Sequence, residues 1–381
     1  MSVSLFFVIF SAAYPSMAHM TSLRNTFRSV VRRFGASGIA LTVVFASACA
    51  QTKTGESSRA DAGRIVERHF ASMGSELKLS IWSPDPSRVT AVEGKIHQEF
   101  IRLEELMSTW KSGSGIQALN AAAGMHPVAV SPELMKLLQT AAQVSGWTNG
   151  KFDVTFAVMS GLWKFDYQNE DETIPDSNEV VRRRKLINYR DLKLDERAGT
   201  AFLARTGMAA GVGGIGKGYA VDRARDILLA GGFHNFMIQF GGDMYVSGKA
   251  GERPWRLGIQ DPRGAENRII ASVELSDSTF STSGDYERFF IKDGRRYHHI
   301  IDPATGEPSI GCRSVTIVTG SATIADGLST GVFLMGPEAG MALIEKLPDV
   351  EGVIVSSSNK VLVSSGLRQR LTILAEPTEG L

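Results

Sequence analysis

Residues 283–309, SGDYERFFIKDGRRYHHIIDPATGEPS, and residues 321–340, SATIADGLSTGVFLMGPEAG, decide how this chain folds and what chemistry it carries. In the first stretch, two strand-like runs flank Asp293-Gly294, a dipeptide typical of tight turns, so the stretch predicts a β-hairpin. The second stretch predicts a helix on which Asp326 and Thr330, four residues apart, lie on one face. Together they predict a site for a metal ion and a phosphate group.

His298 and His299 stand side by side in the second run of the hairpin. Neighbouring residues of a strand point to opposite faces, so at most one of these imidazoles faces a given site. Asp261 and Asp302 each precede a proline, a dipeptide that initiates turns, and turn structure explains both aspartates. The sequence therefore offers one histidine to the predicted site.

The rest of the chain alternates helix-like and strand-like segments, which predicts an α+β fold with mixed, largely antiparallel sheets and packed helices. Asp85-Pro86 and Ser131-Pro132 are typical helix starts, and Gly231-Gly232 is a typical stop. The predicted helices begin near residues 86, 132, 177, 218 and 337. The predicted strands are 76–82, 235–240, 255–260, 268–275, 288–293, 295–301, 314–319 and 352–356.

The N-terminal 49 residues are typical of an export signal. Residues 23–34 are basic, residues 35–48 are apolar, and small residues directly precede Cys49. This pattern predicts a lipoprotein-type export segment over residues 1–49 with Cys49 as the lipidated residue. A plain secretory signal with an incidental cysteine is the alternative.

Three further parts are expected after the export segment. Residues 50–62 are polar and small and predict a flexible tether. Residues 63–370 show neither a low-complexity break nor a clear repeat, so they predict a single domain. Residues 371–381 are expected to form a C-terminal tail.

The composition narrows the class of protein. Of 381 residues, 43% are hydrophobic, and the formal net charge is +1, so the chain lacks the basic excess of a general nucleic-acid binder. The sequence contains only two cysteines, too few for a disulfide framework. No GxSxG, HExxH or CxxC motif occurs, so serine hydrolase, zinc protease and thiol redox activities lack support.

A glycine-rich segment, GVGGIGKG at residues 211–218, precedes a helical pattern and places Lys217 at the helix start. Glycine lets a ligand approach the backbone closely, and amides at a helix start favour anions. The segment matches neither the dinucleotide-binding fingerprint nor the Walker loop, whose flanking strand, acidic residue and GK[ST] ending are missing. Asp326, Ser329 and Thr330 add hard oxygen ligands of the kind that Mg²⁺ prefers.

Nine segments in register resemble the ApbE family of FAD:protein FMN transferases, from about residue 71 to residue 356. They are SMGSELKLSIW, LMSTWKSGSGIQALNAAAG, TNGKFDVTFAVMSGLWKF, GGIGKGYAVDRARDILLAGG, FMIQFGGDMYVSG, PWRLGIQDPR, STSGDYERFF, YHHIIDPATGEP and SVTIVTGSATIADGLSTGVFLMG.

The resemblance implies a single ApbE-like catalytic domain that acts outside the cytoplasm and uses Mg²⁺. It implies that FAD is the substrate, that the FMN half is attached to a threonine or serine hydroxyl of an acceptor flavoprotein, and that AMP is released. Together with the lipoprotein-type start, it implies a protein on the periplasmic side of a bacterial membrane, held there by a lipid anchor.

The resemblance also implies the site residues. His299 would be the catalytic base, and the contacts to the flavin nucleotide would be Met73, Trp110, Lys151, Phe152, Asp153, Gly211, Lys217 and Ile301. The metal ligands would be the main-chain oxygen of Gly214 and the side chains of Asp326, Ser329 and Thr330. Many family members carry aspartate where Gly211 stands, so one side-chain contact to the nucleotide is missing here.

Two other functions remain open on the sequence alone. If water replaces the acceptor hydroxyl, the protein is an FAD pyrophosphatase that yields FMN and AMP. If the glycine at position 211 removes activity, the protein is a lipoprotein that binds FAD without catalysis.

Overall fold

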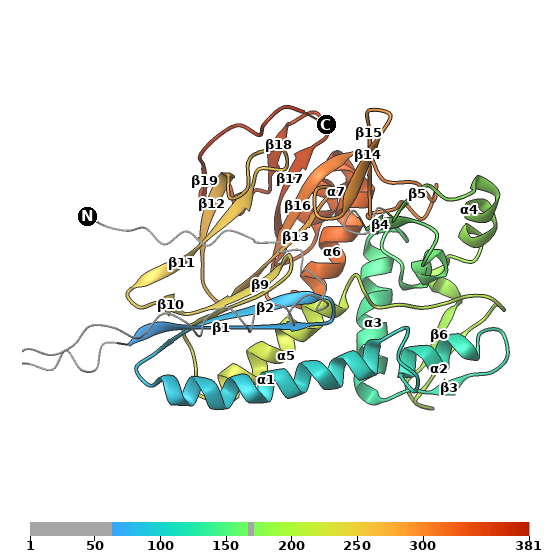
Figure 1. The fold of residues 1–381 in the computed structure, drawn as a ribbon, viewed down its shortest axis with the longest axis horizontal. Coiled ribbons are helices and arrows are strands. Elements are labelled where there is room, and N and C mark those ends of the chain that lie inside the picture. Colours follow the sequence, from blue (N-terminus) through green and yellow to red (C-terminus); the bar gives the residue numbers. More distant parts are fainter. Residues whose placement is uncertain (1–62, 167–170, 381) are drawn as a thin grey trace, which may run out of the picture. The chain divides into compact units, whose positions relative to one another are not determined.

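The computed structural model describes residues 63–166 and 171–380 (Figure 1). The predicted export segment, the tether and Cys49 lie outside these residues. Among the described helices, none is both long enough and apolar enough to cross a membrane.

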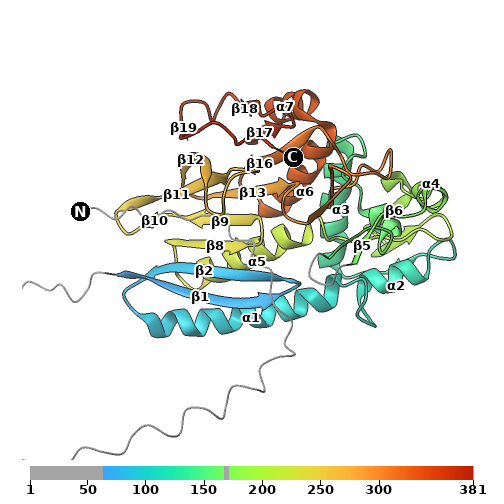
Figure 2. The ribbon, with the colours of Figure 1, turned by 45° about the horizontal axis from the view of Figure 1, so that its top comes forward.

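A central antiparallel sheet organises the described part of the chain (Figures 1 and 2). Its strand order is β1-β2-β8-β9-β13-β16-β17-β18, and each pair of neighbouring strands within it is antiparallel. The predicted antiparallel α+β fold is therefore confirmed. The strands are β1 (Arg64–Ser72), β2 (Ser75–Ser83), β8 (Phe236–Phe240), β9 (Asp243–Ser247), β13 (Ser278–Gly284), β16 (Cys312–Val318), β17 (Glu351–Ser356) and β18 (Val361–Val363).

Helices cover one face of this sheet (Figure 2). The predicted starts of two of these helices are confirmed. The side chain of Asp85 accepts a hydrogen bond from the backbone amide of Ser87, and the side chain of Ser131 accepts one from the backbone amide of Leu134. The apolar residues at helical spacing are buried, as Val89, Val92, Ile96, Phe100 and Leu103 show on the first helix. The helices are α1 (Pro86–Met107), α3 (Pro132–Trp147), α5 (Gly216–Ala230), α6 (Ala322–Met335) and α7 (Pro337–Lys346).

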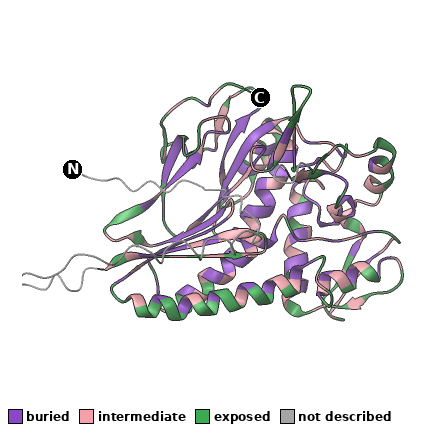
Figure 3. Cartoon of the chain, in the orientation of Figure 1, coloured by how far each residue is buried: buried purple, intermediate pink, exposed green. Residues whose placement is uncertain are grey.

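A smaller sheet supplies strands to a second core on the other face of the central sheet. Trp255 of this small sheet is fully buried among Met237, Phe280 and Val355 of the central strands, and its Nε1 donates to Ser247 O at 2.8 Å. The central strands are thus buried on both faces and appear purple in Figure 3. The small sheet comprises β10 (Lys249–Ala250), β11 (Arg253–Gln260), β12 (Ile269–Leu275) and β19 (Leu371–Ile373).

Shorter elements make up the remainder. The predicted hairpin forms, with Asp293 and Gly294 both at positive φ, as a tight two-residue turn requires. Its strands are β14 (Phe289–Lys292) and β15 (Arg295–His298). The other elements are α2 (Gly115–Ala121), β3 (Val128–Ala129), a 3₁₀ turn at Val154–Met159, β4 (Lys164–Asp166), β5 (Asp171–Thr173), α4 (Ser177–Arg184), a 3₁₀ turn at Tyr189–Asp191, β6 (Leu192–Asp195) and β7 (Thr200–Leu203).

The folded region continues past the boundary predicted at residue 370. Strand β19 pairs with β12, and the buried carboxylate of Asp261 accepts hydrogen bonds from both the amide and the hydroxyl of Thr378. Arg313 donates to the carbonyl of Gly380 at 2.9 Å. A buried carboxylate needs such partners, so residues 371–380, which were expected to belong to a tail, are part of the domain.

Helices α5 and α6 cross in close contact at Gly218. A Cβ built on Gly218 would lie 2.1 Å from the carbonyl oxygen of Ala322 and 2.7 Å from Cβ of Asp326. The glycine therefore fixes the separation of the two helices that carry Lys217 and Asp326.

We expect Gly218→Ala to destabilise the fold by about 1–3 kcal/mol, the usual cost of overpacking a core, because the neighbouring backbone has no room for the added methyl group. Gly94→Ala is the matched control, since Gly94 also lies inside a helix but has open space around its missing Cβ. That control should stabilise the protein by about 0.5–1 kcal/mol. Urea unfolding of both variants measures the difference, and equal stabilities would contradict the role given to Gly218.

Candidate active site

The start of helix α5 carries a lysine between two buried aspartates. Lys217 Nζ lies 2.6 Å from Oδ2 of Asp243, the first residue of β9, and 3.5 Å from Oδ1 of Asp326 on α6. The second carboxylate oxygen of Asp326, Oδ2, accepts a 2.9 Å hydrogen bond from the backbone amide of Gly218. Asp243 and Asp326 keep 2% and 4% of their surface, so protein groups rather than water solvate their charges.

The charges of Lys217, Asp243 and Asp326 shift the pKa values of Lys217 and Asp326. Desolvation and the negative charge of Asp243 raise the pKa of Asp326 above its usual range, and the ammonium of Lys217 opposes that shift. Desolvation alone would lower the pKa of Lys217, but the two carboxylates more than reverse this and raise it above its usual range. Lys217 is therefore charged at neutral pH, and an additional cation near Asp326 would favour the ionised carboxylate.

A row of hydroxyl groups lies on the strand beside α6. The hydroxyl of Ser283 on β13 contacts Ser329 Oγ at 2.8 Å and Thr330 Oγ1 at 3.2 Å. Ser281 lies on the same face of β13 and is the register partner of Asp243 on β9. Within the described residues its buried hydroxyl has no hydrogen-bond partner, a costly arrangement that fits a site built to take an additional polar group.

The donor set fits Mg²⁺. Proteins bind this ion through one or two carboxylates together with phosphate oxygens and water, and Asp326, Ser329 and Thr330 present hard oxygen atoms from one helix. Residues 63–166 and 171–380 contain no group of three or more histidine, cysteine or acidic side chains suited to a metal ion. The described residues thus lack the nitrogen- and sulfur-rich cluster that zinc prefers.

The glycine-rich segment lies against α6. A Cβ on Gly214 would lie 3.2 Å from the ring of Phe152, and a Cβ on Gly331 of α6 would lie 3.2 Å from Phe152 Cβ. A Cβ on Gly327, the residue after Asp326, would lie 3.5 Å from Ile215. Gly214 and α6 are therefore neighbouring segments, with the buried Phe152 packed between them.

The structure separates the two histidines. His298 is buried, and its Nε2 lies 2.7 Å from the carbonyl oxygen of Ser309. His299 follows the last residue of β15, and its side chain is exposed. His298 is thus a structural residue, whereas His299 is open to a ligand, in agreement with the prediction that they face opposite ways.

The imidazole of His299 is neutral at physiological pH. Parts of the residue are in contact with solvent, but the surrounding protein atoms bury its ring enough to lower the pKa of His299 well below the usual range, and the charges of Arg288, His298 and Lys217 add to this. Because the charge of Lys217 helps to lower this pKa, His299 lies within range of the electric field of Lys217. A neutral imidazole can accept a proton.

Other predicted contacts lie close to these groups in the fold. Lys151 Nζ pairs with Asp302 at 2.7 Å and so lies next to Ile301. Met73 occupies the tip of the β1–β2 hairpin at positive φ. A Cβ built on Gly241 would lie 3.6 Å from Oγ of Ser75, two residues after Met73, and 3.8 Å from Cδ of Lys217. The end of the hairpin and Lys217 are therefore close to the same glycine.

Trp110 is exposed over 74% of its surface, which leaves its ring free to stack on a ligand. The residue before it, Thr109, would lie 3.5 Å from a Cβ on Gly211, so the two predicted contacts are close in space. That Cβ would also lie only 3.0 Å from Ala157. A larger residue at position 211 would require Ala157 to move, which explains why glycine suits this chain.

The structure gives Asp153 a structural role. Its carboxylate accepts hydrogen bonds from the amide and hydroxyl of Thr155 and from the amide of Tyr189. Burial raises its pKa above the usual range despite these bonds. Both carboxylate oxygens are directed into the protein, so the nucleotide contact predicted at Asp153 is left to its backbone.

Asp243 is the residue that the sequence analysis missed. It follows Gly241-Gly242 between two apolar strand runs, and an aspartate in that position was the available signal. Its importance depends on the pairing of β9 with β8 and β13, which brings it to Lys217. No local pattern contains that information.

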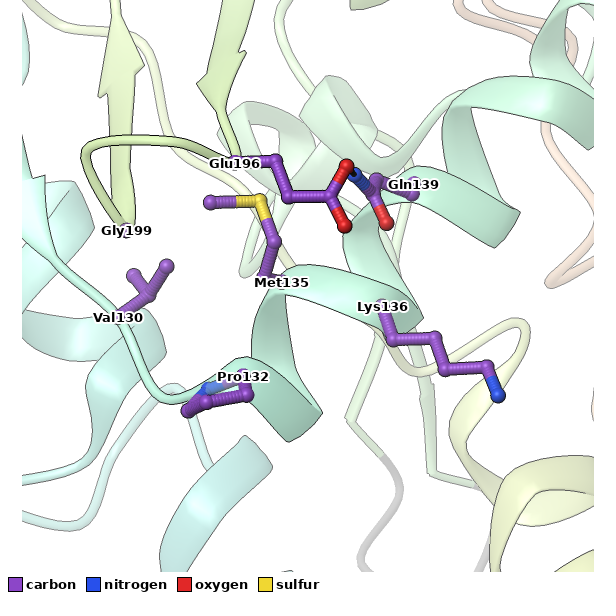
Figure 4. Close-up of a pocket in the computed structure, with 7 residues that line it drawn as sticks. All are labelled: Val130, Pro132, Met135, Lys136, Gln139, Glu196 and Gly199. Atoms are coloured by element: carbon purple, nitrogen blue, oxygen red, sulfur yellow. Dashed lines mark hydrogen bonds between the residues drawn. The ribbon is translucent and has the colours of Figure 1, made fainter.

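A separate hollow of about 370 Å³ lies at the start of α3 (Figure 4). It is lined by Val130, Pro132, Met135, Lys136, Gln139, Glu196 and Gly199. Gln139 and Glu196 bond each other at 3.2 Å across it. None of the predicted site residues lines this hollow, and its polar groups do not converge on a common point, so we place the site at Lys217 instead.

An anion-favouring helix start beside a set of hard oxygen atoms is the arrangement that suits a phosphorylated ligand together with a divalent cation. Comparison with known proteins specifies the family, because the ApbE family model matches residues 73–354. The chain belongs to the ApbE family.

Individual relatives agree with this assignment. The chain is 30% identical over 312 residues to an FAD:protein FMN transferase of Klebsiella pneumoniae, covering 82% of this chain and 95% of the relative. It is 30% identical to an FAD:protein FMN transferase of Treponema pallidum, with coverages of 79% and 87%.

Solved structures agree as well. The ApbE protein of Thermotoga maritima matches with a TM-score of 0.72 and 30% identity, covering 81% of this chain and 99% of that one. The flavin transferase ApbE of Vibrio cholerae also matches with a TM-score of 0.72, at 28% identity and the same coverages.

We expect a pH titration of the His299 imidazole, followed by NMR and assigned with His299→Ala, to have its midpoint below pH 6.5. The folded-state pKa is lowered, so the neutral ring persists to a more acidic pH than in a free histidine. A midpoint at or above pH 6.5 would contradict the desolvated, positively charged surroundings described above.

Proposed function

We propose that this protein transfers FMN from FAD to a threonine or serine hydroxyl of an acceptor protein, with Mg²⁺, and releases AMP. The observation that carries the proposal is the Lys217–Asp243–Asp326 cluster at the start of α5. The charge of its lysine helps to lower the pKa of the exposed residue His299. The relatives named above as FAD:protein FMN transferases support the choice of donor and acceptor.

The chain's own residues suit the reaction in the following way. The neutral imidazole of His299 accepts the proton of the acceptor hydroxyl as the oxygen attacks the phosphorus of the FMN half. A new P–O bond forms, the bond to the bridging oxygen breaks, and that oxygen leaves with AMP. Lys217 and the amides at the start of α5 stabilise the negative charge on the phosphate oxygens.

Mg²⁺ would be held by the side chains of Asp326 and Thr330 and by the carbonyl oxygen of Gly214, with Ser329 beside them. Bound there, it would neutralise charge on the diphosphate and on the departing AMP. Ser329 already donates its hydroxyl to the carbonyl of Asp326 at 2.9 Å, so it supports the helix turn as well as the site.

A second candidate function is hydrolysis of FAD to FMN and AMP. The exposure of His299 favours it, because water has the same access to the ring as an acceptor hydroxyl. The two functions share every residue of the site and differ only in the nucleophile. Incubation with FAD and Mg²⁺ without an acceptor separates them, since rapid release of free FMN would favour hydrolysis.

The test of the proposed function is mass spectrometry of an acceptor protein that is co-expressed with this chain. We expect one covalent FMN on a threonine or serine of the acceptor, and none when the chain carries His299→Ala. The variant should still bind FAD, because His299 acts on the nucleophile and not on the diphosphate. Unmodified acceptor with the unaltered chain would reject the proposal.

Asp326→Asn should lower the turnover of FAD at least 100-fold, because the amide is a poorer ligand for Mg²⁺ than the carboxylate it replaces. The substitution keeps the size of the side chain and its hydrogen bond from Gly218, so the folded structure is expected to persist. Steady-state kinetics across a range of Mg²⁺ concentrations, with circular dichroism as the folding control, provide the measurement. An unchanged rate at low Mg²⁺ would remove Asp326 from the metal site.

We also propose that the protein lies on the periplasmic side of a bacterial membrane, anchored by lipid on Cys49. The basic and apolar stretches before Cys49 support this. Cys49→Ser should move the protein from the membrane fraction to the soluble fraction of the cell envelope, since one substitution removes the attachment point. If both forms sediment with membranes, the anchor does not depend on Cys49.

A further inference from the structure

The ammonium of Lys217 is held unequally by its two carboxylates. It forms a 2.6 Å contact with Asp243 but lies 3.5 Å from Asp326. The shorter contact is a hydrogen bond between charged groups, and the longer one lies outside the usual range of such bonds. Asp243 is therefore the residue that determines where the ammonium stands.

The backbone of Asp243 is fixed from both sides. It pairs with Phe240 on β8 and with Ser281 on β13. The turn before it has little freedom, because Gly241 is at positive φ and a Cβ on Gly242 would lie 2.5 Å from the carbonyl oxygen of Thr282. A short side chain on this rigid backbone holds its carboxylate in one place.

Asp326 is fixed separately. Its Oδ2 accepts the amide of Gly218 at 2.9 Å, and the carboxylate is buried. Its Oδ1 has only the long contact with Lys217 among the described residues. That oxygen therefore keeps lone pairs for another ligand, provided that the ammonium does not move onto it.

We infer that Asp243 is a positioning residue that holds the ammonium of Lys217 away from Asp326 and so keeps Asp326 Oδ1 available to a divalent cation. The inference rests on the proposed function, because it assigns Asp326 to the cation. Asp243 acts through Lys217 and is not itself counted among the metal ligands.

The charges give the inference a measurable consequence. Two carboxylates and one ammonium leave a net negative charge that attracts a cation. If Asp243 becomes neutral, the ammonium can pair with Asp326 alone, and that pair has no net charge. If Lys217 is then also removed, no ammonium competes with the cation for Asp326 Oδ1.

The test is titration of the full chain with Mn²⁺ in the absence of flavin, with free Mn²⁺ measured by electron paramagnetic resonance. We expect Asp243→Asn to raise the dissociation constant about tenfold or more. We expect the double variant Asp243→Asn with Lys217→Met to recover most of that loss, because no ammonium competes for Asp326. Asp243→Glu, which keeps the charge, should remain closer to the unaltered chain than Asp243→Asn.

Two results would overturn the inference. An unchanged dissociation constant in Asp243→Asn would show that Asp243 has no influence on the cation. A double variant as weak as Asp243→Asn would mean that Asp243 binds the metal directly. If Asp243→Asn fails to fold, the double variant is compared with the unaltered chain instead, because it leaves no lysine without a carboxylate partner. A dissociation constant for Mn²⁺ more than tenfold above that of the unaltered chain would again reject the inference.

Asp261→Asn is the matched control, since Asp261 is also buried and also binds its partners through its carboxylate. It should lower thermal stability without changing Mn²⁺ binding. Flavin transfer is measured in parallel on the unaltered chain. Absent transfer together with the expected Mn²⁺ pattern would reject the proposed function alone, whereas intact transfer without that pattern would reject only the role of Asp243.

Discussion

The hydrogen bond from the Gly218 amide to Asp326 Oδ2, 2.9 Å long, is the interaction on which the site depends. It joins the start of α5, where backbone amides favour anions, to the face of α6 that carries Asp326 and Thr330. The bond forms only because residue 218 has no side chain, which lets the backbone of α5 approach the side chain of Asp326 on α6. Lys217 is adjacent in sequence to this contact and is placed by it.

Part of this arrangement could be predicted from local sequence. The Asp85 and Ser131 caps, the Asp293-Gly294 turn and the spacing of Asp326 and Thr330 each act within a few residues, so their patterns are visible without the fold. The same holds for the two histidines, because the alternation of a strand separates neighbouring side chains. The structure confirms that His298 is buried and His299 exposed.

Other parts depend on contacts between distant segments. Asp243 meets Lys217 only after β8, β9 and β13 pair, and the second carboxylate oxygen of Asp153 gains its partner only when the chain brings Tyr189 to it. The residues directly after 370, LTILA, are mostly apolar, but the sequence does not show that Asp261 and Arg313 bind the residues that follow them from more than sixty positions away. The pairing with β12 and the buried partners show that these residues form a strand and its extension.

That C-terminal extension has a consequence for any shortened form of the protein. Strand β19 covers the open edge of β12, whose backbone groups Ala271 to Val273 pair with it. Ending the chain before residue 371 would leave these amides and carbonyls facing solvent on an otherwise apolar strand. Such an exposed strand edge can pair with a strand from a second molecule. Truncating this segment, which is remote from Lys217 in sequence, would therefore promote self-association.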